Sequence, residues 1–219
     1  MCRFNPVISF WRRPAACILL GLTLLHSACT HTPTALFHRS TTTQEKSRTL
    51  SADDKILYLH ALESLKNKQP KGTLQTFKRL QKDYPDFVSA WIGEGDLYLQ
   101  QRQWQQALAA YKQAQTIHPD LPSLYTRQAY CYRQLGQFDE AEQAYQRALR
   151  LNADYALAHY NYAILLDLYL QQPQEAITHF EHYQRLQTTP DPQVAKWLKE
   201  LKRRVAEPLA QNPDAALLP

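Results

Sequence analysis

Three features of this sequence could carry chemistry: a cysteine near the N-terminus, a pair of histidines and a cysteine in the body of the chain. Cys29 follows an apolar run and precedes a threonine-rich stretch, so it could be a disulfide half, a buried thiol or an attachment point. The remaining cysteines are Cys2, Cys17 and Cys131. Because a disulfide framework needs an even set of cysteines spread over the fold, we expect no structural disulfide.

His179 and His182 stand three residues apart and could bind a metal from one helix face. No third ligand with local spacing accompanies them, so we interpret them as surface or inter-helix histidines and expect neither a metal nor a cofactor. Cys131 lies between Tyr130 and Tyr132 with no adjacent cation, which is typical of a buried, inert thiol. The motifs of hydrolases, P-loop enzymes and metalloproteases are missing, so we expect no enzyme activity.

Residues 1–28 have the three parts of a secretory signal peptide. Arg3, Arg12 and Arg13 form a basic start without any acidic residue. The apolar run from 15 to 25 follows, and it is too short to cross a bilayer core of about 30 Å as a helix. Without the three arginines, 22 of the 25 basic residues remain against 20 acidic ones. A nearly neutral chain lacks the basic face that nucleic-acid binding needs, so we expect no nucleic-acid partner.

Ser27, Ala28 and Cys29 resemble the end of a bacterial lipoprotein signal, although His26 stands where that family has leucine. An ordinary signal-peptidase cut before Cys29 would place the same His26 where a small residue is preferred. The resemblance implies that Cys29 is the lipidated first residue of the mature protein, since several acyl chains anchor stably. Thr30, rather than an aspartate, implies the outer membrane of a Gram-negative bacterium, facing the periplasm. Residues 29–52, rich in threonine and serine, would be a flexible spacer.

The body of the chain repeats itself at a period of 34 residues. The clearest unit carries an alternation of aromatic, small and proline positions: Trp91, Gly95, Tyr98, Ala107, Tyr111, Ala114 and Pro119. The next unit has matching residues at most of these positions: Tyr125, Ala129, Tyr132, Ala141, Tyr145 and Ala148. The first and fourth units match more loosely, and the fourth has one inserted residue near Gln171-Gln172-Pro173.

This pattern resembles the tetratricopeptide repeat (TPR) family over residues 54–190. The resemblance implies an all-α fold, a right-handed α-solenoid of about four helical hairpins at roughly 54–87, 88–121, 122–155 and 156–190, within an array at 53–190. Small residues such as Gly95 and Ala107 would allow close helix approach. A C-terminal capping helix is expected at 191–207, with a solvated basic face, followed by a disordered tail at 208–219.

In this family the first helices of the hairpins line a groove that holds a protein or peptide partner. Alignment with the family's groove positions implies a mixed aromatic, aliphatic and charged surface: Tyr58, Leu62, Ile92, Asp96, Leu99, Thr126, Arg127, Tyr130, Arg133, Tyr160, Asn161, Ile164 and Asp167. Such a mixture suits a peptide or helix of another protein.

Signal, lipid cysteine, spacer and repeat array together predict a membrane-anchored, non-enzymatic scaffold that assists assembly of an envelope machine. The architecture resembles the pilotin lipoproteins of type IV pili and the TPR lipoproteins of tight-adherence pili. The alternative is an adaptor lipoprotein that recruits a periplasmic protease or peptidoglycan hydrolase to its substrates.

Overall fold

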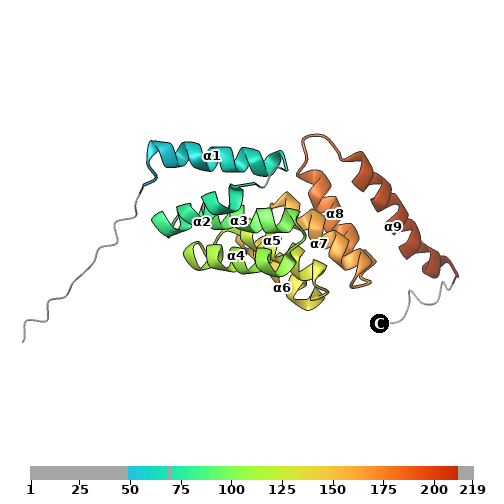
Figure 1. Ribbon diagram of the computed structural model, residues 1–219. Helices are drawn as coiled ribbons and strands as arrows, with labels where there is room; N and C mark the ends of the chain where they lie inside the picture. Colours follow the sequence, from blue (N-terminus) through green and yellow to red (C-terminus); the bar gives the residue numbers. More distant parts are fainter. Residues whose placement is uncertain (1–48, 69–70, 212–219) are drawn as a thin grey trace, which may run out of the picture. The chain divides into compact units, whose positions relative to one another are not determined.

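The structure is a computed structural model that describes residues 49–68 and 71–211, with side chains to residue 207. All of these residues belong to one unit, Glu45–Pro219. Within them the chain forms nine helices and no strand (Figure 1): α1 (Ala52–Lys66), α2 (Thr73–Asp83), α3 (Val88–Gln100), α4 (Trp104–Ile117), α5 (Pro122–Gln134), α6 (Phe138–Leu151), α7 (Ala156–Leu168), α8 (Pro173–Arg185) and α9 (Pro192–Gln211). The predicted signal peptide, Cys29, most of the spacer and the last residues of the tail lie outside the described residues.

The first eight helices pair as four consecutive hairpins, which confirms the predicted all-α repeat architecture. The two helices of a hairpin contact each other, and so do the second helix of one hairpin and the first helix of the next. First helices of neighbouring hairpins also touch, as α5 and α7 do. Each hairpin therefore buries its apolar residues against its sequence neighbours, as expected of a repeat array.

Two glycines of α3 are required by the aromatic rings that lie against them. A Cβ added at Gly95 would overlap the ring of Tyr111 in α4, and one added at Gly93 would overlap the ring of Phe77 in α2. Both rings are fully buried. The predicted role of small residues in close helix packing is therefore confirmed at both glycines, and large rings fill the space these glycines leave.

The turns inside the hairpins use left-handed backbone conformations. Gly136, between α5 and α6, has φ of 75°, and Arg102, 34 residues earlier between α3 and α4, has φ of 58°. Gln171 has φ of 56° in the turn between α7 and α8, which contains the predicted extra residue. Only glycine adopts this conformation without steric cost, so the repeat position is better suited by Gly136 than by Arg102.

Polar side chains cap the first and last helices. Ser51 precedes α1, and its hydroxyl accepts from the backbone N–H of Asp54 at 3.1 Å. The backbone N–H of Ser51 donates to the hydroxyl of Tyr84 at 3.3 Å rather than to Asp54, so only half of a reciprocal capping box forms. Before α9, the carboxylate of Asp191 accepts from the backbone N–H of Gln193 at 2.8 Å, as its sequence position predicts.

The C-terminal helix is longer than predicted. It continues through Pro208 to Gln211, whereas the sequence led us to expect a helix ending at 207 and a tail from 208. A proline removes its own N–H donor from the helix, but the backbone of the following residues can still continue the helical path. Val194 and Leu201 of α9 are buried in the cluster that also contains Phe180, so this helix covers the end of the fourth hairpin.

The first hairpin lacks a preceding neighbour, and one repeat position shows the result. Ile56 of α1 is 52% exposed, whereas the residues 34, 68 and 102 positions later, Ala90, Leu124 and Ala158, are fully buried. Leu59 is also 59% exposed. The interior residues are covered by the second helix of the hairpin before them, and the described part of the chain offers α1 no such helix.

Candidate protein-binding surface

The predicted groove residues divide into two groups, and the first group supports the fold. Ile92 and Leu99 pack on the core around Tyr111. Thr126 is 3% exposed and its hydroxyl donates to the carbonyl of Pro122, so the expectation that Thr126 lines a free surface is wrong. Neighbouring first helices sit too close for a side chain at this position to stay accessible.

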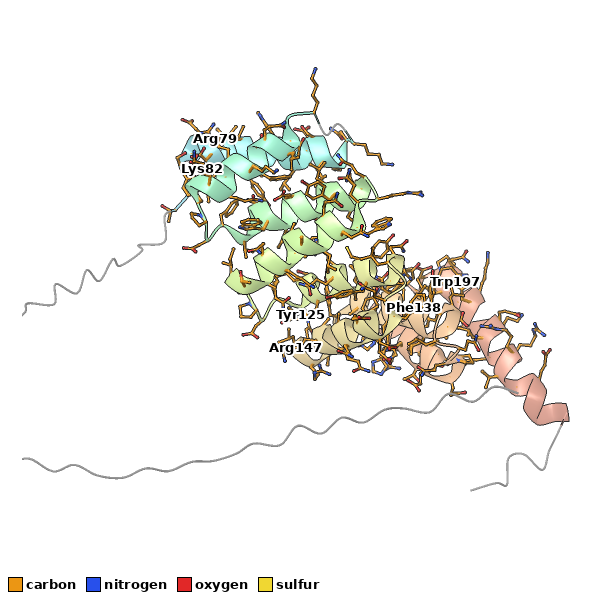
Figure 2. All side chains as sticks on the ribbon, turned by 60° about the horizontal axis from the view of Figure 1, so that its bottom comes forward. Arg79, Lys82, Tyr125, Phe138, Arg147 and Trp197 are labelled. Atoms are coloured by element: carbon orange, nitrogen blue, oxygen red, sulfur yellow. The ribbon has the colours of Figure 1, made fainter. Side chains whose placement is uncertain are left out.

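Two predicted groove tyrosines also pack mainly against the protein itself. The ring of Tyr58 lies edge-on to that of Phe87, with centroids 5.0 Å apart. The ring of Tyr160 lies 5.1 Å from that of Tyr183 and 6.1 Å from that of Trp197 in α9. Figure 2 labels Trp197 on the last helix. These contacts stabilise hairpin junctions.

At the C-terminal end, α9 also engages a predicted groove residue directly. The guanidinium of Arg204 pairs with the carboxylate of Asp167, which is only 16% exposed. Ile164 and Leu62 are half-buried, and the amide of Asn161 donates to the carbonyl of Leu157 at 2.9 Å. The cation of α9 therefore uses Asp167 and leaves it unavailable to a partner in this arrangement.

One carboxylate joins the second and third repeats. Oδ1 of Asp96 in α3 accepts from the hydroxyl of Tyr111 at 2.6 Å and from Nε of Arg127 in α5 at 2.9 Å. Burial, together with this carboxylate, raises the pKa of Tyr111. Both donors are satisfied by a single acceptor, so Asp96 and Arg127 hold the two repeats in register as well as lining the surface.

The other predicted residues, Tyr130 and Arg133, belong to a cluster of aromatic rings around one cation. The guanidinium of Arg133 lies 5.1 Å from the ring centroid of Tyr130 and 5.8 Å from that of Tyr169. The ring of Trp104 lies 6.0 Å from Tyr130, and that of Phe138, labelled in Figure 2, lies 4.9 Å from Tyr169. We call these five residues the Arg133 cluster. Such distances are typical of cation–π contacts.

Sequence reasoning missed three members of this cluster. Trp104 and Phe138 begin the second helices of their hairpins, 34 residues apart, and Tyr169 follows α7 in the longer turn. The period could have revealed the first two as an equivalent aromatic pair. The inserted residue near Gln171 removes the register at Tyr169, so no sequence spacing announces its position.

Beside the cluster, one face of α7 is apolar and accessible. Leu157, Ile164 and Leu168 follow each other at helical spacing on this face, and Leu157 and Leu168 are 50% and 66% exposed. Tyr169, next to Leu168, is 41% exposed. Because the opposite face of α7 packs into the core, these exposed side chains form an unpartnered apolar surface.

A second, shallower groove lies between α4, α5 and α6. Its two hollows, about 530 and 580 Å³, share Lys112, Tyr132 and Glu140. The ammonium of Lys112 lies 5.4 Å from the ring of Tyr132, and the guanidinium of Arg147 lies 5.8 Å from the ring of Tyr125. Figure 2 labels Tyr125 and Arg147 beside each other on this part of the array. Both cations are thus already engaged by aromatic rings.

Three histidines meet between α7 and α8, and their hydrogen bonds fix their tautomers. Nε2 of His159 lies 2.8 Å from the carbonyl of Ala153, which can only accept, so Nε2 carries a proton. Nδ1 of His159 must then accept from Nδ1 of His179, 2.8 Å away. The ring of His182 stacks on His159 at 4.8 Å. The predicted inter-helix role is confirmed for His179.

The described residues contain no group of three metal-ligating side chains that could hold a metal ion. Cys131 is fully buried, and burial raises the pKa of its thiol to about 12, which matches the predicted inert thiol. Over residues 49–68 and 71–211, no helix is long and apolar enough to cross a membrane.

Comparisons with known proteins identify the repeat. Two tetratricopeptide-repeat family profiles match, one at residues 58–122 and one at residues 122–155. No curated protein matches the sequence significantly.

Solved structures with similar folds include a thermophilic TPR protein of Thermus thermophilus, with 22% identity, a TM-score of 0.60 and coverage of 68% of this chain and 81% of that chain. MamA from Desulfovibrio magneticus RS-1 has 19% identity and a TM-score of 0.54, covering 61% and 75%. The first TPR of Spaghetti (RPAP3), bound to an HSP90 peptide, has 24% identity and a TM-score of 0.51, covering 54% and 93%. From the 34-residue repeat, the consecutive hairpins and these matches, the chain belongs to the tetratricopeptide-repeat family.

Proposed function

We propose that this protein is a non-enzymatic, membrane-anchored scaffold that holds another envelope protein through the first helices of its repeats. Tetratricopeptide repeats mediate protein–protein interactions, and the first TPR of Spaghetti holds an HSP90 peptide. The observation that carries the proposal is the accessible surface formed by the Arg133 cluster and the apolar face of α7. Exposed Leu168 and Tyr169 offer apolar contact area for a partner, and aromatic and arginine side chains are enriched in protein interfaces.

The membrane part of the proposal rests on the sequence. Cys29 would carry the lipid, and the threonine-rich segment after it would place the repeats in the periplasm, tethered to the outer membrane. In the native host, Cys29→Ser should abolish incorporation of radiolabelled palmitate and move the protein from the membrane to the soluble fraction or leave it as precursor. Unlabelled wild-type protein would refute the lipid anchor without bearing on the repeats.

The scaffold part can be tested by photo-crosslinking in living cells. A photoreactive amino acid at Leu168 should yield one discrete adduct, and the same probe at Gln113, an exposed residue of α4, should not. A secretin or pilin in the Leu168 adduct would support assembly of a pilus or secretion system. A protease or peptidoglycan hydrolase would instead support the adaptor role, and identical products from both positions would contradict the proposed surface.

A further inference from the structure

The repeat allows one hydrogen-bonding arrangement to be compared with its own counterpart. In the second repeat, the buried hydroxyl of Tyr111 finds an acceptor in the carboxylate of Asp96, which also accepts from Nε of Arg127. One aspartate thus satisfies a tyrosine and an arginine at once. Thirty-four residues later, Tyr145 takes the place of Tyr111, and Tyr130 stands where Asp96 stood.

The third repeat therefore keeps the donors and loses the acceptor. Tyr145 is fully buried, and neither its hydroxyl nor the buried Nε of Arg133 has a hydrogen-bond partner. Burial raises the pKa of Tyr145, while the nearby charge of Arg133 opposes this shift. Within residues 49–68 and 71–207, no carboxylate pairs with Arg133, whereas Arg127 pairs with Asp96. Buried donors left unpaired are destabilising, so an acceptor that reached them would be favoured.

The surroundings of Arg133 indicate which acceptor would fit. The guanidinium lies against the rings of Tyr130 and Tyr169, whose own ring contacts with Trp104 and Phe138 restrict their movement. A planar guanidinium held between aromatic faces can still present N–H groups to a carboxylate along its edge. The rings exclude water on either side, which strengthens such a pair.

Next to the cation the surface is apolar. Leu168 is 66% exposed and adjoins Tyr169, so a ligand that reaches Arg133 must also cover apolar surface. A single cation framed by rings suits one carboxylate beside an apolar group. It does not suit the row of phosphates on a nucleic acid, which requires several exposed cations.

We propose that Arg133 receives an aspartate or glutamate side chain of the partner, and that an apolar residue next to this acid in the partner sequence packs on Leu168. The acid takes the part that Asp96 plays in the preceding repeat, with the Tyr145 hydroxyl as a second donor. This inference rests on the proposed function, because it assigns the chemistry of the segment that the scaffold binds. An internal acidic side chain is chosen over a C-terminal carboxylate because the equivalent acceptor in the array is itself an aspartate side chain.

The test uses a displayed library of random short peptides as the probe, selected on the full chain in detergent. Wild-type protein should enrich peptides with Asp or Glu adjacent to an apolar residue. Arg133→Glu should lose this acidic preference and enrich Lys or Arg instead. Arg150→Gln, which removes an exposed arginine of α6, is the matched control and should select the same peptides as wild type.

An affinity measurement that needs no protein variant follows the selection. A selected peptide is synthesised with its acid and with the matching Asn or Gln, and both are titrated calorimetrically into the wild-type chain. The amide version should bind at least about ten-fold more weakly, because a hydrogen-bonded charge pair is lost. A peptide with an amidated C-terminus should bind like the free acid, and dependence on the terminal carboxylate would overturn the assignment to a side chain.

The remaining outcomes separate this inference from the proposed function. Selected peptides that bind without acidic enrichment, and lose binding with Leu168→Glu, would overturn the carboxylate site but leave the scaffold surface intact. If no peptide binds in a manner sensitive to either Arg133 or Leu168, both proposals fail. Circular dichroism of each variant shows whether its helical content is retained.

Discussion

Acidification should destabilise this protein through the histidines between α7 and α8. Burial, followed by the neighbouring His159 and His182, lowers the pKa of His179 from 6.5 to about 4. Burial also lowers the pKa of His159, and Arg185 and His182 act in the same direction, whereas Asp154 and the carbonyl of Ala153 oppose it. A proton on Nδ1 of His159 would place two N–H groups against each other across a 2.8 Å contact.

The sign and size of the effect follow from proton linkage. The folded-state pKa of His179 lies below the unfolded value, so the unfolded chain binds more protons between about pH 4 and 6.5. The free energy of unfolding should therefore fall as pH drops through this window. For a shift from 6.5 to about 4, the loss between about pH 8 and 5 reaches about 2 kcal/mol, and partial exposure of the ring reduces it to about 1–2 kcal/mol. Asp54, whose pKa is lowered by its hydrogen bonds to Ser51 and Tyr84, loses its contribution only below this window.

Urea unfolding followed by circular dichroism at pH 8 and pH 5 measures the loss. His179→Asn keeps a donor near the position of Nδ1 and removes the titrating ring, so its free energy of unfolding should change less between the two pH values. His60→Asn removes an exposed histidine of α1 and should retain the full wild-type loss. A wild-type stability that is flat over this range, or a loss that persists in His179→Asn, would refute the reasoning.

Three substitutions test the packing and turns. Gly95→Ala should lower stability by about 1–2 kcal/mol in urea unfolding, because overlap with the buried Tyr111 ring outweighs the better helix propensity of alanine; an increase would contradict the required glycine. Arg102→Gly should raise the thermal midpoint, with a gain of about 0.5–1 kcal/mol, because its φ is positive as at Gly136; no gain would show that the turn is unstrained. Tyr111→Phe should cost about 1 kcal/mol and Tyr145→Phe should be nearly neutral without ligand, since only the Tyr111 hydroxyl is hydrogen-bonded; equal losses would argue against an unpaired Tyr145.

The repeat architecture could be predicted because close packing accepts few residue types at certain positions. Gly95 must be small where Tyr111 crosses it, and Ala107 is fully buried in the same hairpin. Such positions recur with the repeat and are visible in the letters. The same reasoning identified the Asp191 cap, because a cap needs only a short-range hydrogen bond.

The surface could be predicted only in part, because accessibility depends on distances between hairpins. Thr126 and Arg127 are neighbours in sequence, yet Thr126 is sealed between helices while Arg127 reaches Asp96. The pairing of Arg204 with Asp167 joins residues 37 positions apart, outside the period of the repeat. Tyr169 enters the Arg133 cluster from a turn whose length departs from the repeat, so spacing alone gave no sign of it.

The exposed Ile56 has a consequence for how the array opens. In a linear stack, each hairpin is stabilised by its interfaces with the hairpins before and after it. The first hairpin has such an interface on one side only, whereas the fourth is covered by α9. Opening should therefore start at α1 and α2, where amide hydrogens should exchange fastest, and the central hairpins should exchange most slowly. Thus the end of the array nearest the proposed membrane anchor would yield first under tension, leaving the partner-binding repeats folded.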